Sequence, residues 1–339
     1  MSEPTDSEVV VVTGASAGVG RATARAFAER GAKIGLLSRG EDGLEGARED
    51  VEEAGGEAVV VPTDVSDFDE VNAAAETVEN AFGPIDIWVN NAMVSVFSPA
   101  AEMIAEDYRR VTEVTYLGYV HGTQVALERM RPRDEGTIVQ VGSALAYRGI
   151  PLQSAYCGAK HAIQGFTESV RTELIHDDCD VQLSMVQMPA MNTPQFEWSK
   201  SRMPKNPQPV PPIYQPEVAA RSITWTVDRG KDELWVGRST VKAILGNRLI
   251  PRRLDNILAS GGYDSQLIDE PTDPDRENNL HEPLSGDFGA HGPFDDRARD
   301  RSYQLQASMH RRAIALLAAL AAVIVSAFLG RWAASAESG

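Results

Sequence analysis

The stretch VVVVTGASAGVG, residues 9–20, runs from a continuous β-branched block into a turn that contains three glycines. Such a block is typical of a strand that is buried on both faces of a parallel sheet. Apolar residues at helical spacing follow from Val19, and Gly31 is placed to end that helix. A glycine turn between a strand and a helix favours a dinucleotide site, because glycine allows a diphosphate to approach and the helix N-terminus attracts it. The alternative interpretation is a tight turn without a ligand.

The rest of the first 250 residues continues this alternation of strands and helices. A long helical pattern covers residues 153–173, and shorter ones cover 216–229 and 241–249. Alternating strands and helices predict an α/β fold with a parallel sheet. After the strand at residues 7–13, further strands are expected at 33–37, 59–62, 85–89, 137–141, 181–187 and 234–236.

The residues after the second predicted strand bear on which dinucleotide is bound. An acidic side chain at this position would bond the ribose hydroxyls of NAD, but the chain has Ser38 there, followed by Arg39. A guanidinium suits a 2′-phosphate, since it can donate two parallel hydrogen bonds. The sequence therefore favours NADP(H) over NAD(H). The alternative is that Arg39 is an ordinary solvated surface residue.

Polar residues also follow the third and fourth predicted strands. Asp64 lies at a strand carboxyl end, where it could accept a hydrogen bond from the adenine amino group. A structural role in starting the next helix is equally compatible with its position. Asn90 and Asn91 could brace the backbone and line the cofactor slot, or form an ordinary Asx-turn.

Three residues in the middle of the chain can move a proton. Tyr156 and Lys160 are four residues apart on a predicted helix, hence on one face, and Ser143 follows the fifth predicted strand. A nearby ammonium lowers the pKa of a phenol, so Tyr156 could exchange a proton with an alcohol or a carbonyl. Ser143 could hydrogen-bond the same substrate oxygen. A surface pair on a helix is the alternative for Tyr156 and Lys160.

Together these residues resemble the classical short-chain dehydrogenase/reductase family. The resemblance rests on the glycine turn, Asn90-Asn91-Ala92, Ser143 and the Tyr156/Lys160 pair, and extends over residues 7–246. It implies a Rossmann-type, doubly wound parallel sheet of seven strands, bound NAD(P)(H), and homodimers or homotetramers. It also implies that Lys160 holds the nicotinamide ribose and that Thr193 meets the carboxamide. The expected cofactor-binding residues are Gly14, Ser16, Gly18, Val19, Gly20, Arg39, Asp64, Val65, Asn91, Ala92, Tyr156, Lys160 and Thr193.

The chain departs from the family pattern at three positions. Met93 and Ala190 stand where the family usually has glycine, and Thr115 stands where it usually has an asparagine. The asparagine supports a water-mediated proton relay to the lysine in that family. Our hypothesis is that Thr115 still helps to place this water, so that Thr115 counts as a candidate catalytic residue.

A proline-interrupted segment follows the sixth predicted strand. Residues 191–214 contain Phe196, Trp198, Met203 and Tyr214. Loops of this length usually form lids or binding loops in compact domains, and the apolar side chains favour an apolar substrate. The alternative is a surface excursion that is packed by its own side chains.

The C-terminal third has a different composition. We expect residues 1–250 to form the catalytic domain, 251–310 to form an acidic, Pro/Gly-rich disordered linker, and 311–332 to form an apolar transmembrane helix. Residues 313–329 carry no charge, and arginines are denser before them than after them. This bias predicts a membrane-anchored protein with its catalytic domain in the cytoplasm. A packing helix is the alternative.

Global properties limit the function further. The formal charge of −17 argues against nucleic acid as a partner. The two cysteines make no disulfide framework, and no ligand spacing supports a metal site. The leading interpretation is a membrane-tethered, NADP(H)-dependent oxidoreductase that interconverts an alcohol and a carbonyl. A dinucleotide-binding sensor or scaffold with little turnover is the rival, favoured by Thr115 and Ala190.

Overall fold

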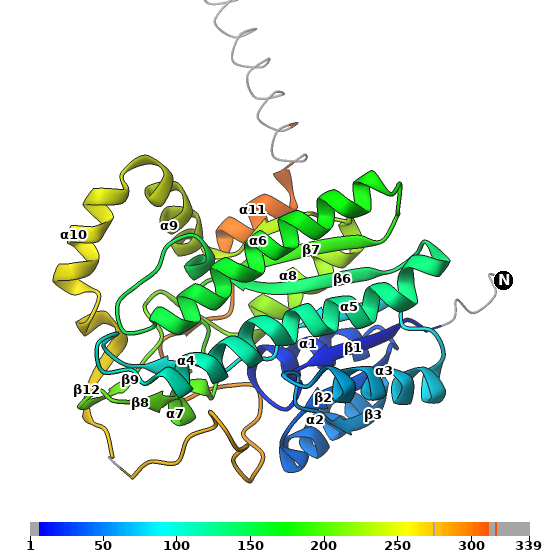
Figure 1. Ribbon diagram of the computed structural model, residues 1–339, viewed down its shortest axis with the longest axis horizontal. Coiled ribbons are helices and arrows are strands. Elements are labelled where there is room, and N and C mark those ends of the chain that lie inside the picture. The colour runs from blue at the N-terminus through cyan, green and yellow to red at the C-terminus, as the bar shows by residue number, and fades with distance from the viewer. Residues whose placement is uncertain (1–6, 274, 312–315, 317–339) are drawn as a thin grey trace, which may run out of the picture.

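A parallel sheet of seven strands forms the centre of the molecule (Figure 1). The computed structural model describes residues 7–273, 275–311 and 316. The strand order is β11-β7-β6-β4-β1-β2-β3, and every neighbouring pair is parallel, so the Rossmann-type α/β prediction is confirmed. The strands are β1 (Val9–Thr13), β2 (Lys33–Ser38), β3 (Glu57–Pro62), β4 (Ile87–Asn90), β6 (Thr137–Ser143), β7 (Gln182–Met188) and β11 (Glu233–Trp235).

Helices cover both faces of this sheet. One apolar core joins the sheet to the helices that carry Phe27, Leu44 and Val218, and the other joins it to the helices that carry Val71 and Val125. The helices are α1 (Gly18–Ala28), α2 (Glu41–Glu53), α3 (Phe68–Phe82), α4 (Ala105–Thr112), α5 (Gly118–Met130), α6 (Ser154–His176), α7 (Gln195–Trp198), α8 (Pro216–Arg229), α9 (Gly237–Leu249), α10 (Pro251–Gly261) and α11 (Tyr303–Met309).

The apolar block at the start of the chain explains why β1 lies inside the sheet. Val10, Val11 and Val12 have no exposed surface, because β2 and β4 flank the strand and helices cover both of its faces. In this register Val10 lies opposite Ile34 of β2 and Ile87 of β4. The carboxyl ends of these parallel strands therefore meet at one edge of the sheet.

The proline-interrupted segment between β7 and α8 is ordered by short strand pairs. Its strand β8 (Lys200–Ser201) pairs with β5 (Val96–Phe97). Two further strands of the segment pair with the C-terminal third, β9 with β12 and β10 with β13. The bounds of these four strands are β9 (Lys205–Pro207), β10 (Ile213–Tyr214), β12 (Leu267–Pro271) and β13 (Ala298–Arg299).

Residues 251–310 differ from the disordered linker that the composition predicts. They form α10, β12, β13 and α11, and the stretch between β12 and β13 lies against the catalytic domain (Figure 1, orange). Residues 279–295 of this stretch are called the C-terminal strap below. The strap buries Leu280 completely and leaves Phe294 only 6% exposed, so two isolated apolar residues provide contacts that its polar composition conceals.

The predicted transmembrane helix falls almost wholly outside the described residues. Of residues 313–329, the structure describes Leu316 alone. Within the described part of the chain, no helix is both long enough and apolar enough to cross a membrane.

Candidate active site

The glycine turn forms a tight cradle between β1 and α1. Gly18 has a φ of +57°, which glycine adopts without strain, and a Cβ there would lie 3.1 Å from Cγ2 of Thr193. A Cβ on Gly20 would lie 2.2 Å from the carbonyl oxygen of Gly14. Because neither position has room for a side chain, another group can approach the backbone at the start of α1 closely.

The two asparagines after β4 have separate roles. Asn91 donates from Nδ2 to the carbonyl oxygen of Thr13 at 3.0 Å, and its N–H donates to Thr13 Oγ1 at 2.9 Å. Asn91 therefore braces the glycine turn, as the sequence suggests. Asn90 is buried instead, where its Nδ2 donates to Gln140 Oε1 at 3.0 Å. Asn90 stabilises the sheet interior and does not line the cofactor slot.

The residues after β2 and β3 form a positively charged corner. The hydroxyls of Ser38 and Ser16 are 2.9 Å apart, so Ser38 ties the end of β2 to the glycine turn. Arg39 lies beside Arg110, whose Nη2 donates to Asp64 Oδ2 at 2.5 Å. Burial alone would raise the pKa of Asp64, but hydrogen bonds from Arg110 and a neighbouring serine hold it below its ordinary value. Asp64 is thus an ionised partner of Arg110, and it does not cap α3.

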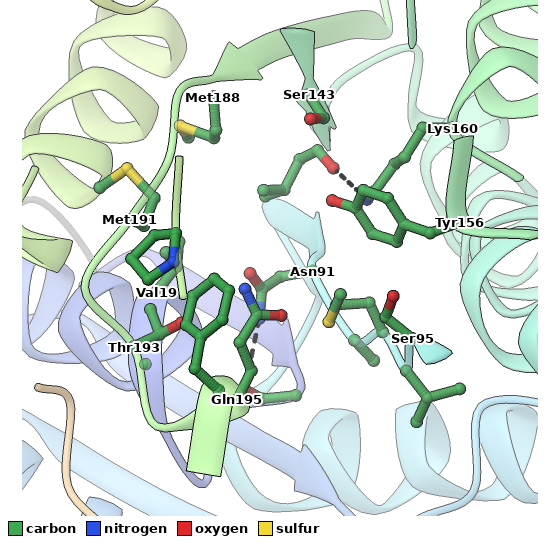
Figure 2. Close-up of a pocket in the computed structure, with 18 of the residues that line it drawn as sticks. Val19, Asn91, Ser95, Ser143, Tyr156, Lys160, Met188, Met191, Thr193 and Gln195 are labelled. Atoms are coloured by element: carbon green, nitrogen blue, oxygen red, sulfur yellow. Dashed lines mark hydrogen bonds between the residues drawn. The ribbon is translucent and has the colours of Figure 1, made fainter. Parts of the chain in front are cut away.

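Tyr156, Lys160 and Ser143 meet in one cavity with the glycine turn (Figure 2). The cavity encloses roughly 460 Å³. In Figure 2, Val19 and Thr193 lie across the cavity from the three side chains. All expected site residues line it except Gly20, which lies within α1, and Thr115. The structure therefore brings together residues that are far apart in the sequence.

The electrostatics of Tyr156 differ from the sequence prediction. Its pKa is raised, because burial disfavours the phenolate and the nearby Ser143 hydroxyl opposes this only in part. Lys160 Nζ lies 5.6 Å from the centroid of the Tyr156 ring and donates elsewhere, to Tyr119 Oη at 2.9 Å and to the carbonyl oxygen of Val141 at 2.7 Å. The prediction that the ammonium lowers the phenol pKa is wrong for this arrangement.

Lys160 itself is buried, at 2% exposure. Burial lowers its pKa to about 7, because a charged ammonium loses its hydration there. Tyr119 is a residue near the proton-moving group that the sequence did not single out. It lies one turn after Thr115, at a position that reads as part of the apolar face of a helix, and only its contact with Lys160 reveals its role.

Thr115 lies in a π-helical turn, Glu113–Leu117, that leads into α5. Its Oγ1 donates to the carbonyl oxygen of Val94 at 2.8 Å and accepts from the N–H of Val94 at 3.0 Å. Thr115 therefore holds the loop after β4, and its part in a water relay stays a prediction. Ala190 is not among the described residues with positive φ, so a methyl group is tolerated there.

The remaining wall of the cavity is mostly apolar. It includes residues that the sequence did not single out, from the loop after β6, from α9 and from the C-terminal strap. These additional lining residues include Leu145, Ile150, Ala243 and Asn279, and Val210 of the proline-interrupted segment also lines the cavity.

Comparison with known proteins identifies the family. The family described as short chain dehydrogenase matches residues 8–203. An uncharacterized oxidoreductase of Bacillus subtilis, YxnA, is 34% identical over 319 residues, which cover 94% of this chain and 89% of the relative. The chain therefore belongs to the short-chain dehydrogenase family, and the prediction of an enzyme of this family is confirmed.

Solved structures support the same assignment. An alcohol dehydrogenase from Thermococcus sibiricus, complexed with 5-hydroxy-NADP, has a TM-score of 0.59 and 28% identity, over 68% of this chain and 95% of that one. A xylitol dehydrogenase bound to NAD+ has a TM-score of 0.53 and 30% identity, over 56% and 72% of the two chains. These neighbours were crystallised with different nicotinamide dinucleotides, so they do not distinguish NADP from NAD.

Proposed function

We propose that this protein interconverts an alcohol and a carbonyl by hydride transfer, with NADP(H) as the cofactor. One observation carries the proposal: Ser143, Tyr156 and Lys160 share a cavity with the glycine turn. The residues present fit a dinucleotide, because the turn excludes side chains where a diphosphate must approach. Bound NAD(P)(H) supplies or accepts the hydride at its nicotinamide ring.

The protonation states of Tyr156 and Lys160 favour the reduction of a carbonyl over the oxidation of an alcohol. The raised pKa of Tyr156 keeps its phenol protonated at neutral pH, so it can donate to the oxygen of a carbonyl. Ser143 orients that oxygen with a hydrogen bond. Lys160, with a pKa near 7, can hold a proton close to the phenol and help to restore it after turnover.

The positively charged corner after β2 supports NADP(H). Arg39 is close enough to Arg110 for their charges to interact, and Ser38 puts no carboxylate where an NAD ribose would need one. The prediction is that Arg39→Ala weakens NADPH binding by about 10- to 100-fold and leaves NADH binding nearly unchanged, since a phosphate contact contributes on the order of 1.5–3 kcal/mol. Arg109→Ala, which changes an exposed neighbour, is the matched control.

The apolar wall of the cavity supports an apolar substrate. Met93, Phe97, Leu145 and Phe196 line the region, with few charged groups among them. A homologous series of ketones tests this assignment. We expect kcat/KM to rise as methylene groups are added, by up to a few-fold each. A series that is flat, or that favours charged ketones, would contradict the assignment.

Turnover separates an enzyme from the rival sensor or scaffold. NADPH consumption is followed with a panel of carbonyls and compared with Tyr156→Phe. An enzyme loses turnover in this variant and keeps dinucleotide binding. A protein that binds the dinucleotide but turns over no substrate, with or without the phenol, would fit the sensor.

We further propose that residues 313–329 anchor the protein to a membrane and leave its catalytic domain in the cytoplasm. The uncharged run and the arginines that precede it support this proposal. Alkaline extraction of membranes that contain the full chain tests it. Release of the protein without detergent would contradict the proposal.

A further inference from the structure

The C-terminal strap begins at the corner that holds the adenosine end of the site. Arg39 donates from Nη2 to the carbonyl oxygen of Asn279 and from Nη1 to that of His281, each at 2.5 Å. Asn279 lines the same cavity as the glycine turn. Leu280, between Asn279 and His281, is fully buried and packs into the core on one face of the sheet. The start of the strap, at Asn279, is thus part of the wall of the cavity.

The strap then crosses the glycine turn. The N–H of Gly18 donates to the carbonyl oxygen of Gly289 at 3.1 Å. Arg21 of α1, whose side chain is only 7% exposed, forms ion pairs with Asp50 and with Asp287 of the strap. A buried guanidinium that joins two carboxylates is a specific contact, since each charge must be compensated.

The far end of the strap reaches the loop that carries Thr193. The N–H of Phe294 donates to Asn192 Oδ1 at 3.0 Å, and Asn192 Nδ2 donates to Asp295 Oδ1 at 2.8 Å. Gly292 packs so closely that a Cβ there would lie 2.4 Å from the carbonyl oxygen of Thr193. One segment therefore contacts the loops after β1, β2 and β7, which together surround the dinucleotide site.

We propose that the C-terminal strap is a cover over the dinucleotide, which must detach from the glycine turn before the cofactor enters or leaves. This inference rests on the proposed function. Most of the strap is held by hydrogen bonds and ion pairs rather than by a continuous apolar face, so it can open while the sheet stays intact. Lids of this kind set exchange rates in many enzymes.

The geometry favours a cover over a plug that fills the site. A cavity of roughly 460 Å³ remains although the strap is closed, and it is lined by Ser16 and Val19 of the glycine turn and by Asn279 of the strap. The similarity to the Bacillus subtilis oxidoreductase takes in the strap, because it covers 94% of this chain. The archaeal alcohol dehydrogenase, by contrast, is matched over 95% of its own length by only 68% of this chain.

Two substitutions in the full-length protein test the proposal. Gly292→Ala puts a methyl group against the backbone of Thr193 and pushes the strap outward. Asp287→Asn removes the strap's charge from Arg21, which keeps Asp50 as a partner. Gly261→Ala is the matched control, because no described atom lies within 4 Å of the added methyl group.

The measurement is NADPH association and release by stopped-flow fluorescence. Both variants are expected to increase the association and release rates by about tenfold, while Kd changes less, because a gate limits both directions. The control is expected to match the wild type. Unchanged rates in both variants would overturn the proposal. A variant that binds NADPH more tightly with an unchanged release rate would identify a plug, which also overturns it.

Hydrogen exchange gives a second measurement that does not depend on turnover. Bound NADPH should slow exchange of the Gly292 and Phe294 amides, which donate to Asn192 when the strap is closed. Equal exchange with and without NADPH would contradict a cover. A wild-type protein that binds neither NADPH nor NADH would overturn the proposed function itself, whereas binding with unaltered strap behaviour would overturn the cover alone.

Discussion

The glycine turn and the C-terminal strap contact each other, and different forces hold them. The turn continues from β1, whose Val10, Val11 and Val12 have no exposed surface. The strap has two well-buried apolar residues, Leu280 and Phe294, and a half-exposed Phe288 whose ring packs edge-on against Trp198. Its other contacts described above are polar. Continuous apolar burial makes one wall rigid, whereas dispersed polar contacts allow the other to open locally. The site thus combines a rigid glycine turn with a C-terminal strap that can detach.

The largest effect is expected from Tyr156 on α6, because the chemistry there does not depend on the C-terminal strap. Tyr156→Phe removes the proton donor and should lower kcat by about 10³, within the usual range for an acid–base group. NADPH exchange rates should not change, because Tyr156 makes no bond with the strap. Steady-state turnover and stopped-flow release are measured on the same preparation.

Tyr147→Phe is the control for this prediction. The Tyr147 hydroxyl donates to Glu233 Oε1 at 2.6 Å, and Tyr147 does not line the cavity. Turnover should stay within a few-fold of the wild type. If Tyr156→Phe kept most of its turnover, the assignment of the proton donor would be wrong.

The next prediction compares two closely packed glycines, Gly20 next to the glycine turn and Gly292 of the C-terminal strap. Gly20→Ala places a methyl group 2.2 Å from the carbonyl oxygen of Gly14. The turn must distort, so NADPH affinity should fall by about 100-fold and unfolding free energy by roughly 1–3 kcal/mol. Gly292→Ala should change the exchange rates with a much smaller change in affinity.

Calorimetry and thermal unfolding measure both quantities. Gly165→Ala on α6 is a suitable control, because the added methyl group meets no neighbour within 4 Å in the described part of the chain. It should stabilise the helix by up to about 1 kcal/mol. If Gly20→Ala and Gly292→Ala lost similar NADPH affinity, the glycine turn and the C-terminal strap would not differ in rigidity as we infer.

A smaller effect is expected at Tyr119, beneath the reaction centre. Tyr119→Phe removes an acceptor from the Lys160 ammonium, which bonds it at 2.9 Å. The charged form then becomes less favourable, so the Lys160 pKa, already lowered to about 7 by burial, should fall further. We expect about a tenfold loss of kcat and a shift of the corresponding pH limb to lower pH.

The pH profile of kcat/KM distinguishes this role from simple packing. Tyr116→Phe, three residues earlier in the chain, should leave the profile unchanged. A Tyr119→Phe profile that overlaid that of the wild type would show that Tyr119 does not position Lys160.

The smallest effect is expected from the ionisation of the strap itself. His291 lies between Glu217 of α8 and Asp295, at 2.8 Å from each. Burial would lower the His291 pKa, but the two carboxylates raise it above its ordinary value of 6.5. Because the folded pKa is the higher one, the stabilisation is complete below about pH 6.5 and is lost as the pH rises through the raised pKa.

NADPH release should therefore become two- to threefold faster, roughly, as the pH rises above this pKa, since a half-exposed ion pair contributes at most about 1 kcal/mol. His291→Gln should remove most of this pH dependence and leave a rate close to that of the wild type at high pH. A release rate that decreased with pH in the wild type would contradict the sign of the effect.

The sequence predicts the glycine turn and the Tyr156/Lys160 pair well, because short local patterns determine both. The β-branched block defines β1, and the spacing of Tyr156 and Lys160 on α6 places both on one face. What spacing cannot give is the direction in which Lys160 Nζ points. That depends on Tyr119 and Val141, and burial determines the resulting pKa values.

The sequence does not predict the structure of the C-terminal strap, because its contacts are made with residues far away along the chain. Its Asp, Gly and Pro content resembles that of a linker, and its partners lie far away along the chain. The pair between Arg21 and Asp287 spans 266 residues. No periodicity reports a contact of that kind. The large apolar residues of the strap, such as Leu280, Phe288 and Phe294, are too scattered to form a pattern.

The aromatic contact made by Phe294 has a kinetic consequence. Its ring lies 6.0 Å from that of Phe196, which in turn lies 6.2 Å from that of Phe97, and both of these partners line the cavity. Lifting the strap withdraws Phe294 from this cluster and disturbs the substrate pocket. If the strap covers the dinucleotide as proposed, we expect substrate to bind well only after the dinucleotide is enclosed. The order of binding would then be fixed by the packing of these three rings, with the coenzyme first on and last off.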